Sequence, residues 1–249
     1  MRTTSRPFSI GVAAIRSGAA YILVALYVLV VGPPTLLLGA FVPVEHLVYV
    51  LSRAGVRLAL VLTGIRVRVT GRENIPAGRG AVFCANHESN VDAPVLFLVL
   101  HPRLHMLYKA EFARVPILGR VIRHARCVPV YREDRDRSIR WLEDAVPLLR
   151  AGSPFLFYPE GTRSQPGVLL PFKKGGFIMA IQAQAPVVPV AMYGAYDAMR
   201  RGSALIFPVT INVRIGEPVD TAGWTTEDRD LIIDQVRSRM LDMLAEGPG

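Results

Sequence analysis

The sequence has few cysteines and lacks the short motifs of several large enzyme classes. Its 249 residues include two cysteines, Cys84 and Cys127, and no C-x-x-C pair. A zinc site or a dithiol redox centre is therefore not indicated, and two buried, reduced thiols are expected. G-x-S-x-G, G-x-x-x-x-G-K-[ST], G-x-G-x-x-G and H-E-x-x-H are also absent. These absences argue against serine hydrolases, P-loop nucleotidases, dinucleotide-binding enzymes and zinc peptidases.

Acidic residues are also scarce. Twenty Asp and Glu face 29 Lys and Arg, which gives a net charge of +9. Such an excess favours anionic partners, namely nucleic acid, phospholipid headgroups or phosphorylated metabolites. The basic residues are spread along the chain, with no zinc-finger, RNP or leucine-zipper pattern, so nucleic acid is not expected as a partner. An anionic membrane surface and phosphorylated metabolites remain as expected partners. A hydrophobic content of 51% excludes a disordered chain.

Charge is missing altogether from residues 17–44, a length that is typical of a membrane segment. Pro33-Pro34 divides this run, and residues 36–63 are apolar again apart from a few charged side chains. We expect residues 1–63 to form a two-helix hydrophobic hairpin, broken at the double proline and lodged in one leaflet. The alternative is one spanning helix over residues 10–32.

Residues 64–249 have the pattern of an α/β domain. Short apolar runs alternate with helical stretches, which predicts a central, mostly parallel or mixed sheet flanked by helices. Strands are expected at 65–70, 81–85, 104–108, 127–131, 154–158 and 187–193, an edge strand at 206–215, and helices at 93–100, 138–150, 174–184 and 226–245. Pro147 inside 138–150 implies a kink or an early end.

His87 and Asp92 follow the predicted strand 81–85. Histidine suits proton abstraction near neutral pH, and a loop at 87–91 would let the Asp92 carboxylate orient the ring. Asp92 and Pro94 also look like the opening of a helix, with Asp92 as its N-cap. In the alternative interpretation, Asp92 is only that cap and His87 only a loop histidine.

Basic side chains follow several other strands and lie near one glycine turn. They are Lys109, Arg132, Arg163 in the Glu160-Gly161-Thr162-Arg163 turn, and Lys173. Carboxyl ends of parallel strands meet at one edge, so these cations predict a phosphate-binding basin beside His87. With a base and no enzyme nucleophile, direct attack of a substrate hydroxyl on an activated acyl group, such as a thioester, is favoured.

Four blocks resemble the motifs of the glycerolipid acyltransferases and occur in the same order. They are Asn86-His87-x-Ser89-x-x-Asp92, Val128-Pro-Val-Tyr-Arg132, Phe157-Tyr-Pro-Glu160-Gly-Thr-Arg163-Ser164 and Val187-Val-Pro189-Val. The resemblance covers roughly residues 66–218 and is greatest to enzymes that acylate 1-acylglycerol 3-phosphate. It implies acyl transfer from acyl-CoA or acyl carrier protein to the sn-2 hydroxyl of that lysophospholipid, giving phosphatidic acid without a metal or other cofactor. It also implies a membrane location, with the active site facing the cytoplasm and an N-terminal two-helix membrane motif.

The same resemblance implies roles for single residues. His87 would be the base and Asp92 its partner, and Pro189 would shape the acyl-chain region. Lys109 would assist the phosphate or the oxyanion. The expected substrate-binding residues are Lys109, Arg132, Glu160, Gly161, Thr162, Arg163 and Lys173.

Two alternatives stay open. The acceptor can instead be glycerol 3-phosphate, another lysophospholipid or a glycolipid, because these activities share the motifs. The other class is a non-catalytic basic protein that binds membranes or nucleic acid.

Overall fold

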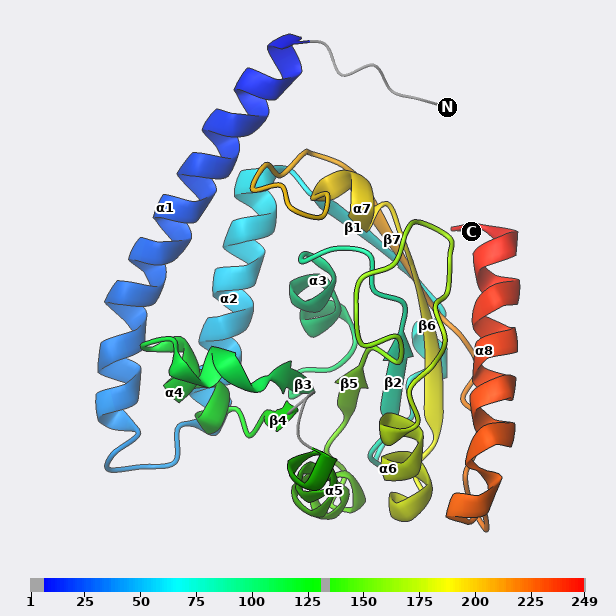
Figure 1. Cartoon of the computed structure of the whole chain (residues 1–249). Helices are drawn as coiled ribbons and strands as arrows, with labels where there is room; N and C mark the ends of the chain where they lie inside the picture. The colour runs from blue at the N-terminus through cyan, green and yellow to red at the C-terminus, as the bar shows by residue number, and fades with distance from the viewer. Residues whose placement is uncertain (1–6, 131–134, 249) are drawn as a thin grey trace.

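A computed structural model of the chain describes residues 7–130 and 135–248 (Figure 1). Its centre is a seven-stranded sheet with the strand order β1-β7-β6-β2-β5-β3-β4. The strands are β1 (Arg66–Thr70), β2 (Val82–Ala85), β3 (His105–Lys109), β4 (Val128–Val130), β5 (Phe155–Phe157), β6 (Val187–Tyr193) and β7 (Thr210–Ile215).

The sheet is mixed, as predicted. Strands β6, β2, β5, β3 and β4 run parallel to one another, so their carboxyl ends share one edge. β7 is antiparallel to β6 and parallel to β1. The expected edge strand at 206–215 is wrong in its position, because β7 lies inside the sheet and β1 forms the edge. Alternating burial along β7 resembles that of an edge strand, but here it arises because only one set of its side chains enters the core.

Helices cover both faces of the sheet (Figure 1). The helices are α1 (Pro7–Leu38), α2 (Glu45–Thr63), α3 (Asp92–Val99), α4 (Leu118–His124), α5 (Arg135–Arg150), α6 (Gly175–Ala183), α7 (Ala195–Ala198) and α8 (Arg229–Glu246). Short 3-10 turns lie at Arg72–Asn74, Ala110–Arg114 and Thr226–Asp228. In β2, Phe83 packs into the core shared with α2 and α3, whereas Val82 and Cys84 face the core shared with α5, α6 and α8.

The first two helices form the expected hairpin, but the break at the double proline is wrong. Helix α1 continues through Pro33-Pro34, and the chain turns at residues 39–44 instead. Two lost hydrogen bonds do not end a helix of 32 residues whose other backbone groups stay paired. The close approach of the helices needs Gly55, where a Cβ would lie 2.8 Å from the Tyr27 ring.

Both helices are long and apolar enough to cross a membrane. Much of α1 is exposed to solvent, including many large apolar side chains between Ile10 and Leu38. An exposed apolar face of this extent is typical of a surface that meets lipid or another protein.

The remaining expectations for the helices are met in part. Helix α5 runs on to Arg150, so the early end expected at Pro147 is wrong. A capping box joins Thr225 and Asp228 ahead of α8. Cys84 is buried, Cys127 is half-buried, and neither forms a disulfide.

Candidate active site

The candidate site lies at the shared carboxyl edge of the parallel strands. Strand β2 ends at Ala85, a loop over residues 86–91 follows, and α3 begins at Asp92. Strand β5 ends next to it at Phe157 and leads into a long irregular segment over residues 158–174. We call these two segments the β2–α3 loop and the β5–α6 loop.

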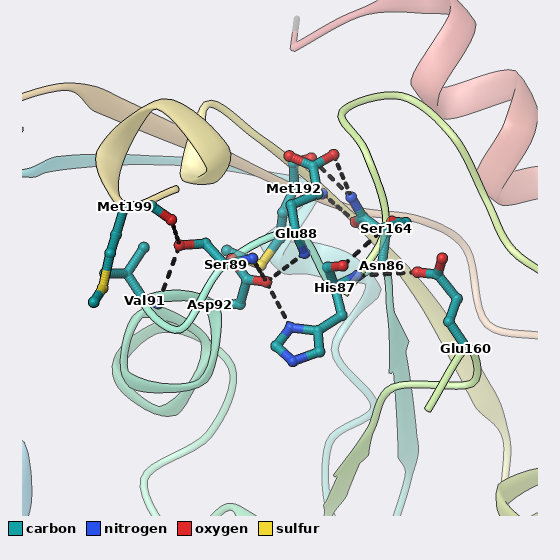
Figure 2. A network of polar contacts seen from close by, with 10 residues as sticks. All are labelled: Asn86, His87, Glu88, Ser89, Val91, Asp92, Glu160, Ser164, Met192 and Met199. Atoms are coloured by element: carbon teal, nitrogen blue, oxygen red, sulfur yellow. Dashed lines mark hydrogen bonds and ion pairs between the residues drawn. The ribbon is translucent and has the colours of Figure 1, made fainter. Parts of the chain in front are cut away.

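The β2–α3 loop brings His87 and Asp92 together (Figure 2). His87 Nδ1 lies 2.8 Å from Asp92 Oδ2. The same oxygen accepts the backbone N–H groups of Glu88, at 2.7 Å, and Ser89, at 2.8 Å. The five-residue separation therefore closes through a loop, as the sequence predicts.

Asp92 does not cap α3, so the expected N-cap position is wrong in both interpretations. Val91 holds the cap position, and Asp92 is the first helical residue. Its carboxylate turns back to the loop that precedes the helix, because three donors converge there on one oxygen. The side chain is fully buried, so its charge faces His87 without competition from bulk water.

The imidazole of His87 is held on one side and open on the other. Its ring stacks on Tyr158, with ring centroids 4.1 Å apart and planes inclined by 20°. The His87 side chain is 20% exposed. Within residues 7–130 and 135–248, no hydrogen bond engages its Nε2 atom. That nitrogen is thus available to a bound group.

Glu160 fastens the β5–α6 loop to the β2–α3 loop (Figure 2). One of its oxygens accepts the backbone N–H of His87 at 3.1 Å, and the other accepts that of Leu170 at 2.9 Å. The bond to Leu170 lies within the β5–α6 loop, and Ser164 adds a second link between the loops, because its backbone N–H donates to the His87 carbonyl at 2.7 Å. Glu160 was expected to contact substrate, but both of its carboxylate oxygens accept backbone N–H groups.

Glu88 provides another link between the loops. Its Oε1 accepts the backbone N–H of Gly167 at 3.3 Å and the side-chain amide of Asn86 at 3.2 Å. Asn86 in turn pairs with both backbone groups of Met192 in β6. Burial, aided by the nearby Asp92 and Glu160 charges, raises the pKa of Glu88 to about 7.

The glycine turn brings Lys173 to the start of the β5–α6 loop. Gly161 has a φ of +67°, and a Cβ there would lie 2.8 Å from Lys173 Nζ. Thr162 is exposed and Arg163 is half-buried. In the described parts of the chain, no carboxylate lies within ion-pair distance of Arg163. Its guanidinium is therefore free to meet an anionic group.

The remaining predicted residues are Lys109, Arg132 and Pro189. The backbone of Lys109 ends β3, at the same sheet edge as His87, while Arg132 lies outside the described residues. Pro189 is buried inside β6, opposite Cys84. Among the described residues, no group of three His, Cys, Asp or Glu side chains is arranged to hold a metal ion.

Comparison with known proteins agrees with this arrangement. The family model described as Acyltransferase matches residues 66–193, which include both loops. The chain belongs to the acyltransferase family. This acyltransferase is 32% identical over 190 residues to the mouse 1-acyl-sn-glycerol-3-phosphate acyltransferase alpha, covering 76% of the chain and 67% of that relative.

Two further similarities bear on its fold and extent. The match to the 1-acyl-sn-glycerol-3-phosphate acyltransferase of Limnanthes douglasii is 30% identical and covers 70% of this acyltransferase but only 61% of that relative. The crystal structure of the 1-acyl-sn-glycerophosphate (LPA) acyltransferase PlsC from Thermotoga maritima superposes with a TM-score of 0.80 at 26% identity. That superposition covers 94% of this acyltransferase and 95% of the other chain.

Sequence reasoning missed two side chains that the structure places in the cluster. Tyr158 stacks on His87, and its buried hydroxyl makes no hydrogen bond within the described residues. Burial, with a smaller effect of Asp92, raises the pKa of this hydroxyl well above its usual value. Glu88 is the other. The position of Glu88 between His87 and Asp92 in the first block was a signal that could have identified it as part of the cluster.

The raised pKa of Glu88 predicts a pH-dependent stability. A carboxyl that is protonated more readily in the folded chain stabilises it below a pH of about 4.5, and this contribution is lost as the pH rises to about 7. Relative to Glu88→Gln, the wild-type free energy of unfolding should fall by roughly 3 kcal/mol across this interval. Urea unfolding in mild detergent between pH 4.5 and 8 measures the difference. Glu73→Gln, at an exposed position, serves as the control. Parallel wild-type and Glu88→Gln curves would contradict the assignment.

Proposed function

We propose that this acyltransferase moves a fatty acyl chain from acyl-CoA or acyl carrier protein to the sn-2 hydroxyl of 1-acylglycerol 3-phosphate, giving phosphatidic acid. The observation that carries the proposal is the His87–Asp92 contact of 2.8 Å, beside a turn that presents Arg163 without a carboxylate partner among the described residues. A base with an open nitrogen serves hydroxyl activation, and a free guanidinium serves a phosphate. The similarity to 1-acyl-sn-glycerol-3-phosphate acyltransferases supports the choice of acceptor.

The proposed reaction needs one proton to move twice. With Nδ1–H donated to Asp92, Nε2 of His87 accepts the proton of the sn-2 hydroxyl while the hydroxyl oxygen attacks the thioester carbonyl. The tetrahedral intermediate then breaks its carbon–sulfur bond, and the imidazolium returns the proton to the leaving thiolate. Asp92 stabilises the imidazolium between these steps and holds the ring in the productive orientation.

The hairpin of α1 and α2 supports a membrane location for this reaction. Its apolar surface would insert into the inner leaflet, with the candidate site facing the cytoplasm, where the anionic headgroups attract the basic chain. The acceptor, a membrane lipid, would then reach His87 from the same leaflet.

An acceptor panel tests the proposal. Purified full-length protein would be incubated with labelled acyl-CoA or acyl carrier protein and with 1-acylglycerol 3-phosphate, glycerol 3-phosphate, lysophosphatidylcholine or a glycolipid acceptor. We expect labelled phosphatidic acid as the dominant product. Preferred transfer to another acceptor would overturn the substrate assignment, and no transfer to any of them would overturn the activity.

Arg163 provides a prediction about acceptor binding. Arg163→Ala removes the charge-assisted hydrogen bonds proposed for the acceptor phosphate, which are worth roughly 1.5–3 kcal/mol. The KM for 1-acylglycerol 3-phosphate should therefore rise by about 10- to 100-fold, measured by initial rates at saturating donor. Arg201→Ala, at an exposed position, is the control. An unchanged acceptor KM would contradict this role.

A further inference from the structure

A basic pocket lies outside the two site loops. It has a volume of about 340 Å³ and is formed by α2 and the connection between α3 and β3. Four basic side chains line it, and no acidic one does: His46, Arg53, Arg57 and Arg103. None of its lining residues belongs to the β2–α3 loop or the β5–α6 loop. The candidate active site therefore does not account for this pocket.

Arg53 prepares the pocket for an anion. Its guanidinium donates to the carbonyl of Phe97 at 3.0 Å and also reaches that of His101 at 3.4 Å. These carbonyls lie at the end of α3, where the helix dipole presents negative charge. By covering them, Arg53 removes the repulsion that an anion would otherwise meet.

Arg57 and Arg103 supply charge that the described chain does not neutralise. Both side chains are exposed, and no carboxylate among residues 7–130 and 135–248 lies within ion-pair distance of either one. Arg57 lies one helical turn after Arg53, so two cations share one face of α2. The positive charges also affect the neighbouring His101. Burial lowers the pKa of His101, and the Arg103 charge lowers it further. Like charges held this close favour a bound anion.

We propose that this pocket binds the phosphate group of an anionic membrane phospholipid. The surroundings favour a lipid over a free ion, because α2 is long and apolar enough to enter a membrane and Val50, in the pocket wall, is 48% exposed. A phosphodiester would lie between Arg57 and Arg103 while its acyl chains follow the apolar surface of the hairpin. The site would fix how deeply the hairpin sits at the headgroup level. This inference does not depend on the proposed acyl transfer.

Calorimetric titration of the full-length protein in a nonionic detergent tests the site. The probes are dihexanoyl phosphatidylglycerol, dihexanoyl phosphatidylcholine and inorganic phosphate. The test variant is Arg57→Gln/Arg103→Gln, which leaves the hydrogen bonds from Arg53 to the end of α3 intact. The matched control is Arg66→Gln/Arg68→Gln, which removes two exposed cations from the edge strand β1. Arg163→Gln reports any binding at the candidate active site, and circular dichroism checks that each variant is folded.

We expect saturable binding of phosphatidylglycerol that weakens at least about tenfold in Arg57→Gln/Arg103→Gln. Affinity should stay within about twofold of wild type in the β1 control and in Arg163→Gln. Absent binding, equal affinity in the test variant, or equal loss in the β1 control would overturn the site, and loss in Arg163→Gln would move the binding to the candidate active site. Inorganic phosphate or phosphatidylcholine binding as tightly as phosphatidylglycerol would overturn the assignment to an anionic lipid.

Discussion

Replacement of His87 by alanine is expected to lower kcat by ~10²–10⁴-fold while the protein stays folded. Nδ1 of the ring faces Asp92 at 2.8 Å, which leaves Nε2 open. In the described part of the site, Nε2 is the only nitrogen placed to take a proton from a substrate hydroxyl. The variant loses the stacking on Tyr158 but keeps the backbone N–H and carbonyl of His87, which link the two loops, so we expect the site loops to stay in place. Release of CoA in the presence of 1-acylglycerol 3-phosphate measures the effect.

The control for His87→Ala is His124→Ala. His124 lies in α4, outside both site loops. Its replacement should leave turnover within about twofold of wild type, because neither loop is altered. A folded His87→Ala protein with near-normal turnover would remove the general-base mechanism.

Asp92→Asn is expected to lower kcat by about 10²–10⁴-fold, comparable with the loss caused by the same change in a Ser-His-Asp triad. The amide oxygen can still accept the N–H groups of Glu88 and Ser89, so the loop keeps its shape. What is lost is the negative charge that stabilises the imidazolium.

Comparison of kcat with the acceptor KM distinguishes two roles for Asp92, namely orientation of the base and a purely structural role. The KM for the acceptor should stay within about threefold of wild type in Asp92→Asn, and thermal unfolding should shift little. Asp242→Asn, at an exposed position on α8, is the matched control. A folded Asp92→Asn protein with wild-type kcat would contradict the proposed role, and so would a loss confined to KM.

Much of the sheet could be predicted because its strands are continuous apolar runs. β2, β5 and β6 are buried along almost their whole length, and such runs separated by helices are typical of parallel sheets. The order of the strands could not be predicted in this way. Pairing of β7 with both β1 and β6 depends on contacts between segments far apart in the chain, and local periodicity carries no information about them.

The prolines show the limit of local propensity. Pro33-Pro34 predicts a break, and Pro147 predicts a kink or an early end. In both places the helix continues. A proline removes one hydrogen bond and costs about 3 kcal/mol in a helix interior. Burial of the other residues of α5 against α6 and β4 offsets a cost of that size.

The pairing of His87 with Asp92 could be predicted because it is local, five residues apart across one loop. The role of Glu160 could not, because its partners are backbone N–H groups 73 and 10 residues away. The stacking of Tyr158 on His87 likewise requires β5 to lie beside β2. Types of residue indicate chemistry, but only the fold shows which carboxylate orients a base and which one fastens a loop.

The links between the two site loops have a consequence for turnover. Glu88, Glu160 and the His87 carbonyl hold the segment from Ser164 to Leu170 before any substrate arrives. The conformational entropy of this segment is thus lost once, during folding, and is not lost again in each catalytic cycle. Preorganisation of this kind favours rapid turnover, because binding free energy is not consumed in ordering the protein.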